Sequence, residues 1–96
     1  MLFQKAKKLQ SISGQGSLTS ASKDIETRKA EDVRLYAAVG HPLIYRHKEP
    51  DGTIKVVYTS AVTDITYYEG MRLRIKTTNS QFKFNMLSST SKCLTV

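Results

Sequence analysis

The sequence predicts a mainly β fold, α+β at most: a small, strongly bent antiparallel sheet or a partly open SH3-like or OB-like barrel of four to five strands, preceded by a short helix. Residues 54–87 contain three consecutive runs in which apolar and polar side chains alternate with the period of a strand. Turn-forming residues separate these runs at short intervals. The apolar positions also change phase between Ser60 and Asp64, which predicts a bulge of the kind that turns corners in small barrels.

The length and composition fit one globular domain with a modest core. The 96 residues are 40% hydrophobic and 24% charged, which is typical of a folded chain rather than a disordered one. We predict a flexible basic N-terminal arm with a Ser/Gly-rich linker over residues 1–21. A single small β-rich domain is predicted over residues 22–96.

The N-terminal third predicts a basic segment that is either a helix or a frayed end, then a linker, then a short helix. Leu2, Ala6 and Leu9 recur at helical spacing among lysines, which favours a short basic amphipathic helix. Residues 11–22 are rich in Ser and Gly, which is typical of flexible linkers. Ser22 is a good helix N-cap with two acids in the following turn, and it predicts a second helix over residues 22–32.

Alternation and local turn chemistry predict the remaining elements. Residues 33–39 and 43–47 alternate as strands. Residues 49–52, Glu-Pro-Asp-Gly, join the second of these strands to the next one, because Pro presets one backbone angle and Gly accepts a positive φ. Residues 77–80, Thr-Thr-Asn-Ser, predict the turn of another hairpin, whose first strand starts at Met71.

This last hairpin concentrates positive charge on one face. Arg72, Arg74 and Lys76 alternate with apolar residues, and Lys83 takes the matching parity after the turn. Residues 71–96 hold five basic residues and no acidic one, in a chain of net charge +7. Because like charges this close repel one another, a face that keeps them favours contact with an anion.

The sequence predicts no enzyme, no cofactor and no metal site. His41 and His47 flank one strand and face different ways, and Cys93 is the only cysteine, so no set of zinc ligands is present. No Gly-x-Ser-x-Gly sequence marks a catalytic serine. No apolar run approaches the roughly 20 residues of a membrane span, and no secretory signal is visible, so we predict a cytoplasmic protein.

The predicted function is non-enzymatic binding of DNA or RNA. Basic side chains would follow the phosphates while neighbouring aromatic rings stack on bases. The candidate binding residues are Arg72, Arg74, Lys76, Lys83, Tyr67 and Tyr68.

Three alternatives stay open. The same face, or an exposed strand edge, would serve an inhibitor or adaptor that binds an acidic protein surface. Exposed apolar sheet surface would serve a homo-oligomer. In the plainest alternative, the basic row is a solvated strand face, and the core takes Tyr45, Tyr58 and one of Tyr67 and Tyr68.

Two segments carry a resemblance. Residues 57–62, Val-Tyr-Thr-Ser-Ala-Val, and residues 78–84, Thr-Asn-Ser-Gln-Phe-Lys-Phe, are similar to hairpins of uncharacterised small β-rich proteins of bacteria and their phages, of no one specific family. The resemblance implies no activity. It favours an accessory, host-directed or viral protein that acts by binding.

Overall fold

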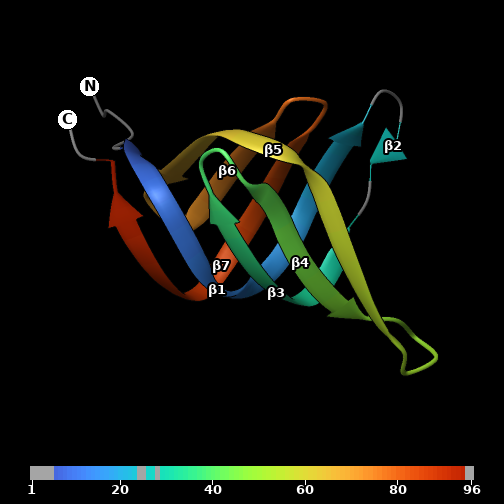
Figure 1. Cartoon of the computed structure of the whole chain (residues 1–96). Coiled ribbons are helices and arrows are strands. Elements are labelled where there is room, and N and C mark those ends of the chain that lie inside the picture. Colours follow the sequence, from blue (N-terminus) through green and yellow to red (C-terminus); the bar gives the residue numbers. More distant parts are fainter. Residues whose placement is uncertain (1–5, 24–25, 28, 95–96) are drawn as a thin grey trace.

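The computed structural model describes residues 6–23, 26–27 and 29–94, and these residues form seven β-strands and no helix (Figure 1). The strands are β1 (Ala6–Lys23), β2 (Glu26–Thr27), β3 (Ala30–Ala38), β4 (Pro42–Lys48), β5 (Ile54–Tyr68), β6 (Arg72–Thr77) and β7 (Gln81–Cys93). The prediction of a mainly β fold is therefore confirmed.

Six of the described strands close an antiparallel barrel, so the predicted four to five strands and the partly open form are wrong. The order is β1-β3-β4-β5-β6-β7, and β7 returns to pair with β1. The two-residue β2 extends the sheet beside the end of β1. β1 closes the barrel because it pairs with β3 through Ser11–Leu18 and with β7 through Leu9–Ser22.

The structure contradicts the predicted short helix. Residues 6–12 begin β1, and residues 30–32, the end of the second predicted helix, begin β3. Pairing of β1 with β5 and β7 outweighs the weak helical preference of a segment this short. The parts of the two predicted helices that lie outside the described residues are 1–5, 24–25 and 28.

The described part of the predicted arm and linker is a central strand. Residues 6–21 belong to β1, which has a neighbour on each side from Ser11 to Leu18. The alternation within this stretch is hidden by serines, but Leu9, Ile12 and Leu18 reach the barrel interior. The boundary predicted at residues 21–22 therefore falls inside β1 and not between an arm and a domain.

Two glycines let β1 cross β7 at close range. A Cβ atom on Gly14 would meet the backbone oxygen of Ser88, and one on Gly16 would meet that of Asn85. The β1–β7 register shifts between Gln15 and Gly16, so the approach occurs at a bulge. These glycines therefore provide space where the strands bend.

β5 bends because its two halves pair with different strands. Its first half pairs with β4, and its second half pairs with β6 and with Ala6–Lys8 of β1. The predicted change of phase is confirmed by a register shift between Val62 and Asp64. A second shift, opposite Pro42–Ile44 of β4, was absent from the prediction. Ile54, Val56 and Tyr58 consequently face outward, whereas Val62 faces the core.

One apolar core fills the barrel, and all six barrel strands contribute to it. Tyr45 of β4 makes edge contacts across the interior with Phe82 and Phe84 of β7, at ring centroid distances of 6.0 and 6.1 Å. The largest fully buried side chains are Phe84, Leu9, Ile12, Leu43, Ile65, Leu73, Ile75, Val33 and Val62. Because β4 and β7 meet across this core, their outer faces lie on opposite sides of the barrel (Figure 1).

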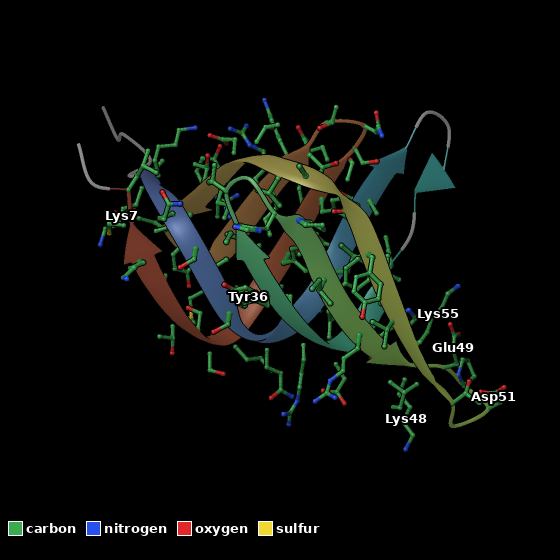
Figure 2. All side chains as sticks on the ribbon, viewed as in Figure 1. Lys7, Tyr36, Lys48, Glu49, Asp51 and Lys55 are labelled. Atoms are coloured by element: carbon green, nitrogen blue, oxygen red, sulfur yellow. The ribbon has the colours of Figure 1, made fainter. Side chains whose placement is uncertain are left out.

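The β4–β5 hairpin confirms the turn predicted at residues 49–52. The Gly52 amide donates to the Glu49 carbonyl oxygen at 2.9 Å, and Gly52 has a φ of 93°. Hydrogen bonds from the Thr53 hydroxyl and amide hold the pKa of the Asp51 carboxyl below its ordinary value. Figure 2 shows this hairpin, with Glu49 and Asp51 labelled, extending beyond the barrel.

The β6–β7 turn is also where the sequence places it. The Thr77 amide donates to the Ser80 carbonyl oxygen at 2.9 Å, and the Ser80 amide donates to Thr77 Oγ1 at 3.0 Å.

None of the described residues belongs to a helix that could cross a membrane.

Candidate functional site

The four predicted cationic residues lie together on the outer face of β6 and β7, and we call Arg72, Arg74, Lys76 and Lys83 the cationic face. Strand alternation directs them outward because their neighbours Leu73 and Ile75 are buried in the core. Arg74 lies directly opposite Lys83 in the β6–β7 ladder. Side chains at such positions start about 5 Å apart. The antiparallel register thus brings all four charges to one surface.

The two tyrosines predicted beside this face lie on different sides of β5. Tyr68 lies opposite Arg72, on the outer side of β5, and Tyr67 lies opposite Leu73. The Arg74 guanidinium carbon lies 5.6 Å from the centroid of the Tyr68 ring, within the range of a cation–π contact. Tyr67 is half-buried and packs against the core. Tyr68 therefore joins the cationic face and Tyr67 does not.

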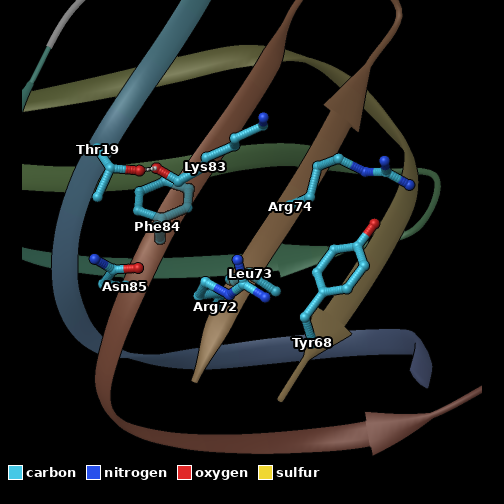
Figure 3. Close-up of a pocket in the computed structure, with 8 residues that line it drawn as sticks. All are labelled: Thr19, Tyr68, Arg72, Leu73, Arg74, Lys83, Phe84 and Asn85. Carbon is cyan, nitrogen blue, oxygen red and sulfur yellow. Dashed lines mark hydrogen bonds between the residues drawn. The ribbon is translucent and has the colours of Figure 1, made fainter. Parts of the chain in front are cut away.

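A shallow depression of about 400 Å³ lies beside these side chains (Figure 3). The Thr19 hydroxyl of β1 donates to the Lys83 carbonyl oxygen at 3.1 Å and closes one side of the depression. Cationic side chains and the Asn85 amide thus surround one hollow beside the Tyr68 ring, and these cationic and amide groups are donors suited to an anion. The lining residues are Thr19, Tyr68, Arg72, Leu73, Arg74, Lys83, Phe84 and Asn85.

One acid, Asp64 of β5, lies beside the cationic face. Lys8 Nζ donates to Asp64 Oδ1 at 2.7 Å and to the Thr66 hydroxyl at 2.9 Å, and that hydroxyl donates to Asp64 Oδ2 at 2.8 Å. Arg74 Nη2 lies 3.8 Å from Asp64 Oδ2. This network connects β1, β5 and β6 at the outer surface.

The pKa of Asp64 reflects two opposing effects. Burial raises the pKa of this carboxyl, but the hydrogen bonds from Lys8 and Thr66 and the charges of Lys8 and Arg74 outweigh burial. The pKa therefore lies below its ordinary value, and Asp64 is ionised near neutral pH. Its charge offsets part of the positive field of Arg74.

A second outer face, on β3, β4 and β5, was absent from the prediction. Its side chains form two rows that run across the three strands. In the first row, Ile44 of β4 lies between Tyr36 of β3 and Tyr58 of β5. In the second row, Arg46 of β4 lies between Arg34 of β3 and Val56 of β5. The side chains of Tyr36 and Tyr58 are 50% and 70% exposed. We call this surface the tyrosine face; its residues are Arg34, Tyr36, Ile44, Arg46, Val56 and Tyr58.

The sequence contained part of the signal for this second face. Arg34 and Tyr36 alternate with apolar residues in a stretch that was predicted as a strand. Tyr58 was assigned to the core in one alternative, and the structure places it outside because β5 shifts register after it. Tyr45, placed in the core in the same alternative, is buried.

The described His, Cys, Asp and Glu side chains form no cluster that could bind a metal ion. Among the described residues, no group of three or more His, Cys, Asp or Glu side chains could hold a metal ion. His47 Nε2 lies 3.9 Å from Glu49 Oε1, and His41 and Cys93 are exposed.

The chain matches no protein-family model, and comparisons with curated proteins and with solved structures give no significant match.

Proposed function

We propose that the protein binds nucleic acid without catalysis and contacts its phosphates through the cationic face. The observation that carries this proposal is the shared outward orientation of Arg72, Arg74, Lys76 and Lys83 on two adjacent strands. Maintaining Arg74 opposite Lys83 costs stability, because like charges directly opposite each other repel. A polyanion that binds there removes this cost.

Phosphate binding at this face would follow from counterion release. Each phosphate neutralised by a lysine or arginine frees a condensed counterion, so affinity falls as salt rises. The guanidinium groups of Arg72 and Arg74 can each grip two phosphate oxygens. Asn85, on the opposite wall of the depression, provides a further donor, whereas the Thr19 hydroxyl already donates to the Lys83 carbonyl oxygen.

The salt dependence of binding to a short DNA duplex tests the proposal. We expect the double substitution Arg72→Ala/Lys76→Ala to reduce the slope of log affinity against log salt by about 1.8, because each phosphate contact contributes about 0.9. The measurement is fluorescence anisotropy between about 50 and 200 mM salt, the range over which such contacts change affinity strongly.

A matched control separates a local contact from the effect of net charge. Lys29→Ala/Lys55→Ala removes two charges from the end of the barrel, where both residues line a different hollow. We expect this variant to keep the wild-type slope. An equal reduction in both double variants, or an unchanged slope in Arg72→Ala/Lys76→Ala, would reject the cationic face as the site.

The free edge of β7 supports a second candidate function, the binding of a protein strand. Residues 87–93 pair with β1 on one side, have no partner on the other among the described residues, and are all exposed. An unpaired edge is a template for another chain. A partner captured from lysate after nuclease treatment, and lost when proline replaces Ser89 or Ser91, would favour this function.

A further inference from the structure

We propose that the tyrosine face stacks unpaired bases, so that this protein binds single-stranded nucleic acid through both faces and duplex through the cationic face alone. This inference rests on the proposed function and assigns the bases to a surface separate from the cationic face. Tyr36 and Tyr58 provide the rings, and Arg34 and Arg46 provide the charges for the adjoining phosphates.

The spacing of the rings suits two bases. Tyr36 and Tyr58 occupy the same row on strands that are separated only by β4, so their Cα atoms lie about 10 Å apart. Ile44 lies between them and is 36% exposed, which gives an apolar floor between the two rings. Figure 2 labels Tyr36 on β3, and Figure 1 shows β4 between β3 and the first half of β5. Stacking tolerates any sequence, because every base has a π face.

The charges beside the rings favour a polyanion. Arg34 lies directly opposite Arg46, and neither arginine forms an ion pair with any described residue. Asp32, which lines one hollow with Arg34 and Arg46, accepts a hydrogen bond from Gln15 Nε2 at 2.8 Å. A hollow of about 230 Å³ lies between the two rows, lined by Arg34, Leu35, Tyr36, Ile44, Tyr45, Arg46 and Val56.

The same charges argue against pairing of this face with a second copy of the chain. A twofold contact through the tyrosine face would bring Arg34 and Arg46 of one copy near those of the other in a desolvated interface. Burying unpaired like charges is costly. A nucleic acid strand, in contrast, supplies bases for the tyrosine rings and negative charge for the two arginines.

The surface between the two faces would let one strand contact both. β1 lies between β3 of the tyrosine face and β7 of the cationic face, and neither β1 nor β7 contains an acidic residue. Ser13 and Gln15 of β1 lie beside Tyr36 and Arg34, and Asn85 of β7 lies beside Arg72. A strand that crosses here passes over neutral polar side chains. For comparison, one OB-fold barrel binds about 4–16 nucleotides.

Paired anisotropy titrations test the inference. The probes are a fluorescein-labelled oligo(dT) of about 12 nucleotides, within the usual site size, and the matching dA·dT duplex. We expect Tyr36→Leu/Tyr58→Leu to weaken oligo(dT) binding at least about tenfold while duplex binding stays unchanged. Tyr36→Phe/Tyr58→Phe keeps both rings and should retain wild-type affinity. Because the chain has no Trp, the tyrosine fluorescence quenched by unlabelled oligo(dT) in the wild type but not in Tyr36→Leu/Tyr58→Leu reports stacking on these two rings.

Each contrary result is distinct. Wild-type oligo(dT) affinity in the leucine variant, or equal losses for both probes, overturns the stacking surface. If Arg72→Ala/Lys76→Ala still weakens duplex binding in that case, the proposed function stands alone. If wild-type protein binds neither probe, both proposals fall. Light scattering at two concentrations that shows a dimer, which Tyr36→Leu/Tyr58→Leu dissociates, identifies a self-interface and also overturns the inference.

Discussion

The two outer faces of the barrel share one unfavourable feature and differ in how the rest of the molecule offsets it. Each places two cationic residues directly opposite each other, Arg74 with Lys83 on one face and Arg34 with Arg46 on the other. Arg74 lies 3.8 Å from the Asp64 carboxylate and next to the Tyr68 ring. The arginine pair has no acid partner among the described residues.

This difference indicates different roles for the charges. On the cationic face, the network of Lys8, Asp64 and Thr66 places a carboxylate oxygen 3.8 Å from Arg74 Nη2. Arg34 and Arg46 are exposed and form no ion pair with any described residue. Arg34 and Arg46 therefore keep their whole charge for a ligand, whereas part of the charge of Arg74 is already neutralised.

The largest effect is expected where β1 separates the two faces. We expect Gly16→Val to destabilise the barrel by about 3 kcal/mol or more, because its Cβ would meet the Asn85 backbone and neither strand can yield without losing its pairing. Urea unfolding followed by circular dichroism measures the loss. Both faces should lose their ligands together in this variant.

The control for this prediction is Ser13→Ala on the same strand. Ser13 is exposed, so its change should stay within about 0.5 kcal/mol. A Gly16→Val protein as stable as the wild type would show that the β1–β7 approach is looser than the structure indicates.

Local chemistry explains which elements could be predicted from the sequence. The hairpin at residues 49–52 and the one at residues 77–80 depend on turn residues and alternation within a few positions. β1 depends on β7, whose paired residues lie about sixty or more positions later, and its serines and glycines suggest a linker when taken alone. The cationic face was predictable because one short alternating run contains most of it.

The tyrosine face was not predictable because no short run of sequence contains it. Its six residues come from three strands, and the outward direction of Tyr58 depends on a bulge opposite β4. Asp64 was overlooked for the same cause, since its partner Lys8 lies on a strand that the sequence did not predict. The outward direction of Tyr58 and the contact of Asp64 with Lys8 both depend on how different strands pair with each other.

Asp64→Asn should have an intermediate effect that is confined to the cationic face. The lowered pKa means that the ionised carboxylate stabilises the fold; this contribution is complete above about 3.9, the ordinary pKa of an aspartate, and is lost as pH falls through the lower folded value. We expect a loss of about 1 kcal/mol near neutral pH, since the network is partly exposed. Urea midpoints at several pH values measure it.

The pH dependence provides the test of this explanation. The difference between wild type and the Asp64→Asn variant should shrink as pH falls below about 4, where the wild-type carboxyl also becomes neutral. Duplex affinity should rise in the variant, because Lys8 and Arg74 lose their competing anion. A stability difference that is constant from neutral to acid pH would mean that packing, not charge, explains the loss.

The smallest expected changes in stability come from substitutions that compare the two opposed cationic pairs directly. Arg46→Glu turns the Arg34 pair into an opposite-charge pair and should stabilise the protein by about 0.5 kcal/mol. Lys83→Glu should stabilise it less, because Arg74 already interacts with Asp64 and gains little from a second acid. Arg46→Gln, which removes repulsion without adding attraction, should fall between wild type and Arg46→Glu. Shifts of the urea midpoint at constant slope measure all three. If Lys83→Glu stabilises the protein as much as Arg46→Glu does, the two faces are electrostatically equivalent, and Asp64 does not offset the repulsion around Arg74.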